Sequence, residues 1–192
     1  MEKEYTNLLK EQPKDHSTKD KDEFISCVIF DPAGRPLRFT RNRQQKLDPG
    51  KYDFLSGHMT EKSETPIHAL IREITEEVGM KREDIAEIYD LKRGKTPHKK
   101  FANHTCHFYC LITNLSEEQI NEAIQKVAHP ELEKAEFLDS IEVLENQMRI
   151  GENWRSQYTE DARIKLNMMK QIIEQRKQLE EKYQTKQQEQ ER

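Results

Sequence analysis

The sequence predicts an α/β domain in which helices pack on a mixed β-sheet. Segments with strand-like and helix-like hydrophobic patterns alternate along the chain. Several strand-like segments end in turn signals, for example at residues 31–34 and 47–50, which favours hairpin-like connections. Apolar residues are concentrated between residues 24 and 150, and this stretch is long enough to bury one core.

Composition divides the chain into three parts. Residues 1–23 are charged and nearly devoid of apolar side chains, which predicts a polar N-terminal arm. Residues 24–150 form the expected domain. Residues 151–192 predict a C-terminal amphipathic helix from Trp154 onward, with a polar end that frays beyond Leu179. The apolar residues of this helix recur at spacings of three and four: Tyr158, Ala162, Leu166, Met169 and Ile173.

Six segments have the pattern of β-strands. The strongest places Cys106, Phe108 and Cys110 on one face, with His107 and Tyr109 on the other. The strands are expected over residues 24–30, 37–43, 52–55, 85–91, 104–113 and 136–138.

Three helices are expected within the domain. Thr65 and Pro66 favour a helix start, and Gly79 favours a helix end. Ser116 and Gln119 have the spacing of a capping box. The helices are expected over residues 66–78, 116–127 and 140–148.

Charge and composition exclude several classes of protein. With 32 basic and 36 acidic residues the net charge is −4, which argues against a broad nucleic-acid-binding surface. There is no run of about 18 apolar residues to span a membrane, and the N-terminus lacks the apolar core of a signal peptide. Cys27, Cys106 and Cys110 are too few for a disulfide framework. We therefore expect a soluble cytoplasmic protein.

The predicted helix over residues 66–78 carries an unusual acidic face. Glu73, Glu76 and Glu77 lie three and four residues apart, where like charges destabilise a helix by roughly 0.2–0.5 kcal/mol per pair. They also lie in its C-terminal half, where the helix dipole disfavours negative charge. A solvated acidic face is the simple interpretation, but a divalent cation bound to all three carboxylates would remove the repulsion. The apolar stripe of the same helix consists of Ile67, Leu70, Ile71, Ile74 and Val78.

The segment over residues 57–80, GHMTEKSETPIHALIREITEEVGM, resembles the Nudix box, G-x5-E-x7-R-E-U-x-E-E-x-G-U with U a bulky aliphatic residue. From Glu64 to Met80 every specified position fits. Six residues separate Gly57 from Glu64, where the family has five. The upstream segment PGKYDF, residues 49–54, is similar to the family's entry into the box.

The resemblance implies a Nudix-type α/β/α sandwich that hydrolyses a diphosphate linked to another group with Mg²⁺ or Mn²⁺. Glu64 and Arg72 would form an ion pair between the loop and the helix, and Glu73 would also help to activate water. The metal ligands implied are Gly57, Glu73, Glu76 and Glu77. Some relatives use a further acid from a later loop as the base, and the candidates here are Glu117, Glu118, Glu131, Glu133 and Glu136.

A small anionic diphosphate, such as a nucleotide sugar, a dinucleotide or a nucleoside triphosphate, is the expected substrate. A basic segment that would suit such an anion, or remain a solvated loop, consists of Lys92, Arg93, Lys95, His98, Lys99 and Lys100. Arg41, Arg43 and Lys46 precede the box and would suit the same anion. Candidate aromatic residues for stacking on a base are Phe24, Phe39, Tyr52, Phe101 and Phe108.

A transition-metal site is not expected. His104 and His107 fall on opposite faces of their strand, and Cys106 and Cys110 share a face with Phe108 as small core residues. The same expectation applies to His58, His98 and His129.

Three other functions, and one state of assembly, remain open at this stage. Residues 56–58 are similar to the entry of isopentenyl-diphosphate isomerase relatives, but the cysteine context of those enzymes is absent. An RNA 5′-end pyrophosphohydrolase is favoured by the basic segment and disfavoured by the net charge. A ligand sensor without catalytic activity would have no need of the complete acidic set. Dimers are common in the family, so the C-terminal helix is also a candidate homodimer contact.

Overall fold

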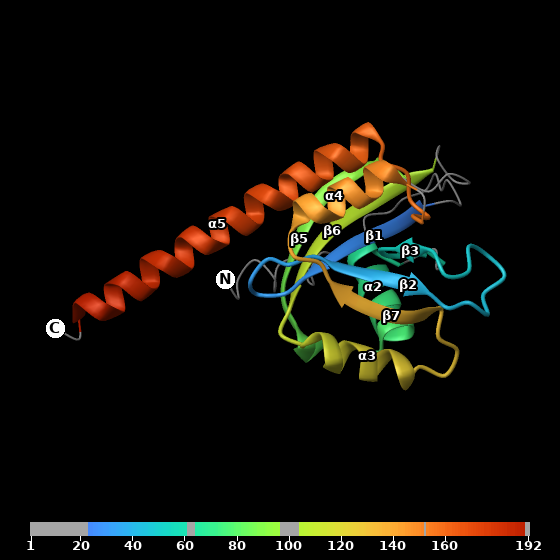
Figure 1. Cartoon of the computed structure of the whole chain (residues 1–192), viewed down its shortest axis with the longest axis horizontal. Coiled ribbons are helices and arrows are strands. Elements are labelled where there is room, and N and C mark those ends of the chain that lie inside the picture. Colours follow the sequence, from blue (N-terminus) through green and yellow to red (C-terminus); the bar gives the residue numbers. More distant parts are fainter. Residues whose placement is uncertain (1–22, 61–63, 97–103, 152, 191–192) are drawn as a thin grey trace.

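The computed structural model describes residues 23–60, 64–96, 104–151 and 153–190, and these residues form a mixed α/β domain (Figure 1). The predicted fold class is confirmed. The predicted arm over residues 1–23 lies outside the described residues except for Glu23, which begins the first strand.

A four-stranded mixed sheet lies at the centre of the domain, with strand order β4-β1-β6-β5. β1 (Glu23–Phe30) runs parallel to β6 (Thr105–Thr113) and antiparallel to β4 (Leu55–His58). β5 (Ile85–Lys95) runs antiparallel to β6. The two inner strands are buried on both faces, and this explains why they appear in the sequence as nearly continuous apolar runs.

A second, antiparallel sheet has the order β3-β2-β7. β2 (Leu37–Arg41) lies between β3 (Tyr52–Asp53) and β7 (Leu132–Phe137). The sequence predicted one strand over residues 52–55. The chain instead passes from the small sheet to the large one at Phe54, so that β3 and β4 belong to different sheets.

Helices cover both faces of the four-stranded sheet (Figure 1). α2 (Pro66–Glu73) and α3 (Glu117–Gln125) lie on one side with the small sheet. α4 (Ile141–Ile150) and α5 (Glu160–Gln190) lie on the other side. α3 begins with the predicted capping box, in which the Gln119 N–H donates to Ser116 Oγ (3.3 Å) and the Ser116 N–H donates to Gln119 Oε1 (2.9 Å).

The two faces of β1 belong to two separate apolar cores. Ile25 and Ile29 pack in the core that contains α2, α3 and the small sheet. Phe24 and Phe30 pack in the core that contains α4 and α5. The period-two alternation of a strand therefore divides one apolar run between two layers.

The C-terminal helix differs from the prediction at both ends. α5 begins at Glu160 rather than near Trp154, because Trp154 is bridged to Tyr52 and the residues from there to Thr159 are not helical. It continues to Gln190 rather than ending near Leu179, and its C-terminal part projects away from the domain (Figure 1). None of the helices in the described ranges is both long enough and apolar enough to cross a membrane.

Candidate active site

The predicted start and end of the box helix are both present. Thr65 is the N-cap: its side-chain oxygen accepts a hydrogen bond from the N–H of His68 (3.4 Å), and Pro66 follows at the first helical position. Gly79 ends the helix in the left-handed conformation, with φ 73°. The predicted apolar stripe packs in the core, with Ile71 only partly buried; its fully packed members are Ile67, Leu70, Ile74 and Val78.

The last part of this helix, over Ile74–Val78, is a π-helical turn rather than a continuation of the α-helix. The wider turn places the three acids in different environments. Glu73 is buried, with 8% of its surface exposed, Glu77 is half-buried, and Glu76 is exposed. A π-turn within an α-helix often marks a functional site, and here it begins directly after Glu73 and contains Glu76 and Glu77.

Arg72 is the centre of the hydrogen bonds in the box. Its Nε donates to Glu64 Oε1 (2.8 Å), which is the predicted ion pair between loop and helix. One terminal nitrogen donates to both Glu73 Oε1 (2.7 Å) and Glu76 Oε2 (3.0 Å). The other donates to the backbone carbonyl of His58 (2.8 Å). These carboxylates, Glu64 first, raise the pKa of Arg72, so the guanidinium remains charged and ties β4, the loop and the helix together.

Gly57 lies directly against the carboxylate of Glu73. A Cβ atom at position 57 would be 2.0 Å from Glu73 Cδ and 2.1 Å from Glu73 Oε1. Glycine is thus the residue that allows this close approach. Residues 61–63 of the loop lie outside the described residues; on either side of them, Gly57 lies against Glu73 and Glu64 contacts Arg72.

The acidic face is short of positive charge. Burial is the main factor that raises the pKa of Glu77, and the charges of Glu131, Glu73 and Asp53 raise it further. Burial also raises the pKa of Glu73, against the opposing effect of Arg72, and Glu131 contributes there too. No described residue donates a hydrogen bond to the Glu77 carboxylate.

Beside this face, the buried Arg41, the half-buried Arg155 and three acids form a chain of alternating charge. Arg41 lies 3.0 Å from Glu131 and 3.9 Å from Asp53, measured between guanidinium nitrogen and carboxylate oxygen. Arg155 lies 2.8 Å from the same Asp53 oxygen and 3.6 Å from Asp48. Burial raises the pKa of Asp53, whereas Arg155 and then Arg41 oppose the shift. Arg41 was expected to reach substrate phosphates, but it is only 4% exposed and is committed to this chain.

The structure distinguishes between the five later acids. Glu131 is the one whose charge is among the main influences on both Glu73 and Glu77. Glu117 accepts the N–H of Phe137 (2.8 Å), and Glu136 is paired with Arg38. Glu118 points into solvent at the start of α3, and Glu133 is about half exposed beside Arg43.

The box residues fit a hard divalent cation by their donor chemistry. Within the described ranges, no group of three or more acidic, histidine or cysteine side chains stands in a metal-binding geometry. Arg72 instead bridges Glu73 and Glu76. The set nevertheless consists of carboxylate oxygens, which Mg²⁺ and Mn²⁺ prefer, and burial together with neighbouring carboxylates raises the pKa of Glu73 and of Glu77.

The other predicted site residues are dispersed. Lys92, Arg93 and Lys95 belong to β5, which is longer than predicted, and are therefore not in a loop. Phe39 is fully buried in the core, and Tyr52 stacks with the Arg38 guanidinium at 3.8 Å. His98, Lys99, Lys100 and Phe101 lie outside the described residues.

Several of the aromatic and histidine residues named from the sequence lie on the first strand, on its neighbours, or next to them. The rings of Phe24 and His58 lie 3.9 Å apart between centroids, on β1 and β4. His104 and His107 do not converge on a metal: His107 faces Glu23, with its Nε2 at 3.0 Å from a carboxylate oxygen.

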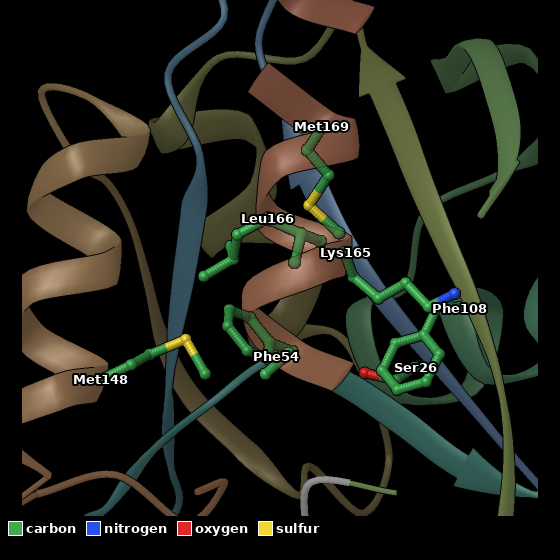
Figure 2. Close-up of a pocket in the computed structure, with 9 residues that line it drawn as sticks. Ser26, Phe54, Phe108, Met148, Lys165, Leu166 and Met169 are labelled. Carbon is green, nitrogen blue, oxygen red and sulfur yellow. The ribbon is translucent and has the colours of Figure 1, made fainter. Parts of the chain in front are cut away.

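A small cavity lies between the large sheet and the helices α4 and α5 (Figure 2). Its volume of about 20 Å³ has room for roughly one water molecule. The cavity is therefore too small for a nucleoside. Among the residues that line it, Lys165 donates from its ammonium group to the backbone carbonyls of Leu91 (2.6 Å) and Arg93 (3.3 Å). The side chains that Figure 2 labels are Ser26, Phe54, Phe108, Met148, Lys165, Leu166 and Met169.

Sequence reasoning did not predict the roles of Asp53 and Arg155. Asp53 gave one signal, a single acid within the apolar run YDFL. Arg155 gave none, because its contact with Asp53 depends on how the segment after α4 returns to β3.

Comparison with known proteins agrees with this architecture. A family model described as NUDIX domain matches residues 22–160. The crystal structure of DR0079 from Deinococcus radiodurans has a TM-score of 0.54 at 16% identity, over 74% of this chain and 82% of that chain. The structure of the E. coli dihydroneopterin triphosphate pyrophosphohydrolase has a TM-score of 0.52 at 17% identity, over 76% of this chain and 92% of that chain. A comparison with curated proteins found no match.

Proposed function

Because the chain belongs to the NUDIX domain family of hydrolases, we propose that it cleaves the diphosphate of a nucleoside diphosphate linked to another group, by attack of water on phosphorus. The observation that carries the proposal is the hydrogen-bonded unit around Arg72, which holds Glu64, Glu73 and Glu76. This unit ties these three acids of the box to the end of the helix and to β4, whereas Glu77 stands outside it.

Glu73, Glu76 and Glu77 are the residues that would hold Mg²⁺ or Mn²⁺, and the carbonyl of Gly57 is a further candidate. A divalent ion bound there supplies positive charge to the phosphate oxygens and makes water a better nucleophile. Arg72 keeps Glu73 and Glu76 in place and remains charged itself. Glu77 would gain from a cation, because burial and then the charges of Glu131, Glu73 and Asp53 raise its pKa against the weaker opposing effect of Arg41.

Glu131 is the residue that we assign as the general base. Its negative charge is among the causes that raise the pKa of Glu73 and of Glu77, so it acts on both acids of the face. In this role Glu131 accepts a proton from the attacking water as the oxygen of that water forms its bond to phosphorus. The leaving phosphate departs with the electrons of the broken anhydride bond.

The buried cysteines disfavour an isomerase that depends on a reactive thiol. Cys27, Cys106 and Cys110 are all buried, and burial raises the pKa of each thiol. Such thiols are poor proton donors to a bound ligand and poor nucleophiles at neutral pH.

The test is a substrate panel with purified protein and Mg²⁺ or Mn²⁺, covering nucleotide sugars, dinucleotides, nucleoside triphosphates and 5′-triphosphorylated RNA. We expect release of a nucleoside monophosphate or of inorganic phosphate from a small nucleotide. Glu76→Gln should lower kcat by about a hundredfold or more, and because Glu76 is exposed the fold should be unaffected. Glu83→Gln, another exposed acid, is the matched control. Activity that survives metal chelation would contradict the proposal, and cleavage of the RNA alone would replace the substrate class.

A further inference from the structure

The Arg41 side chain is fixed between two carboxylates that belong to different segments. It contacts Glu131 at 3.0 Å and Asp53 at 3.9 Å, and only 5% of the side chain is exposed. The register of β2 against β7 shifts between Thr40 and Arg41, which is a β-bulge. A bulge redirects the side chain that follows it, and here it directs Arg41 to Glu131, just before β7.

The backbone around Glu131 is also fixed to β2. The N–H of Asn42 donates to the carbonyl of Glu131 (2.8 Å), and the Asn42 side-chain amide donates to the carbonyl of Pro130 (3.2 Å). Main chain and carboxylate of Glu131 are therefore held by two consecutive residues, Arg41 and Asn42. A loop residue held at both ends has little freedom to leave its position.

Asp53 is held from a third segment. Arg155 donates to Asp53 Oδ2 (2.8 Å), and the N–H of Phe54 donates to Asp53 Oδ1 (2.9 Å). The backbone of Arg155 is paired with β3, since its N–H donates to the carbonyl of Tyr52 (3.0 Å). The position of Asp53 thus fixes the far side of the Arg41 guanidinium.

This arrangement lies beside the acidic face of the box. The negative charges of Glu131 and Asp53 act on Glu77, and the positive charge of Arg41 acts in the opposite direction. Removing Arg41 would leave Glu131 close to Glu73 and Glu77 without a counter-charge, and like charges would move its carboxylate outward.

We propose that Arg41 is a positioning residue that holds Glu131 against the acidic face of the box, and that Arg155 supports Arg41 through Asp53. The inference rests on the proposed function for the role of Glu131 as the general base. It concerns a separate property, which is the position of the Glu131 carboxylate. Neither arginine touches the reacting atoms. Both act through Glu131.

The experiment compares Arg41→Lys, Glu131→Gln and the double variant in the full chain with Mn²⁺ and the best nucleotide of the panel. Lysine keeps the charge but loses the fork that reaches two carboxylates. We expect Arg41→Lys to lower kcat by about tenfold to a hundredfold while KM changes by less than about threefold. In the Glu131→Gln background, Arg41→Lys should have no further effect on kcat. Arg176→Lys, which alters a similarly enclosed pair with Glu87 (2.9 Å) on another face, is the matched control and should match the wild type.

Three results would overturn the proposal: an unchanged kcat in Arg41→Lys, effects that multiply in the double variant, or a loss confined to KM. If Arg41→Lys does not fold, Arg155→Lys replaces it in the same double-variant comparison with Glu131→Gln. If Arg155→Lys still lowers kcat in the Glu131→Gln background, that result counts against the proposal. A wild type inactive on every nucleotide refutes the proposed function instead. In that case crystal structures of the wild type and of Arg41→Lys test whether Arg41 positions Glu131. A Glu131 carboxylate in the same place in both structures would refute the positioning role without any activity assay.

Discussion

The α-carbon of Gly57 and the carboxylate of Glu73 lie so close that a methyl group on the glycine would be 2.0 Å from Glu73 Cδ. Gly57 belongs to β4, whereas Glu73 is the last residue of α2. The contact therefore joins the sheet to the acidic end of the helix. The atoms in the way are the end of a flexible side chain, so a larger residue would displace the carboxylate rather than the backbone.

Gly57→Ala should lower kcat by about tenfold or more, because the displaced Glu73 carboxylate can no longer meet Arg72 and the metal together. The Tm should change little, and steady-state kinetics with thermal unfolding would measure both. Gly151→Ala supplies the opposite control: Gly151 has φ 73° at the end of α4, so alanine there should cost about 1 kcal/mol of stability and leave kcat unchanged. A normal kcat in Gly57→Ala would show that the contact has no catalytic consequence.

Local chemistry explains what could be predicted of the box helix. Thr65 and Gly79 act within a few residues of their own position, so their roles as start and end could be read from the sequence. The ion pair of Glu64 with Arg72 followed from the family resemblance. The π-helical turn could not be predicted, because the apolar pattern does not distinguish it from an α-helical turn; in the structure the Thr75 hydroxyl reaches the carbonyls of Ile71 (2.9 Å) and Met80 (3.3 Å) at its two ends.

Contacts between distant segments explain what could not be predicted. The sequence offered five later acids without preference, and Glu131 stands out only once β2 pairs with β7 through a bulge at Arg41. The contact of Arg155 with Asp53 joins residues 102 positions apart. Pairing of this kind is set by tertiary packing, which hydrophobic periodicity does not encode.

Lys165→Met should destabilise the domain by about 1–3 kcal/mol, because it leaves the buried carbonyl of Leu91 and the partly buried carbonyl of Arg93 without this donor. Lys165 caps the carbonyls of Leu91 and Arg93, on either side of an irregularity in β5 where Lys92 has φ 69°. Thermal unfolding followed by circular dichroism would measure a loss of about 2–4 °C per kcal/mol. The exposed Lys182→Met is the control for loss of a lysine. A variant as stable as the wild type would show that water satisfies the two carbonyls instead.

Glu77→Gln should stabilise the metal-free protein at neutral pH, although it removes a proposed metal ligand. Burial, followed by the charges of Glu131, Glu73 and Asp53, raises the pKa of Glu77 in the folded state above its ordinary value of 4.5. A raised carboxyl pKa favours folding below pH 4.5 and loses that contribution as pH rises through the folded-state value.

The stability of the wild type relative to Glu77→Gln should therefore be lowest at neutral pH, and the two should converge as pH falls toward 4.5. Thermal unfolding in a chelator across this range would measure the difference. Excess Mg²⁺ should reverse the order at neutral pH, because the ion binds the folded wild type more tightly than the variant and stabilises it by mass action. A metal-free wild type that is more stable than Glu77→Gln at neutral pH would contradict the charge deficit inferred for the acidic face.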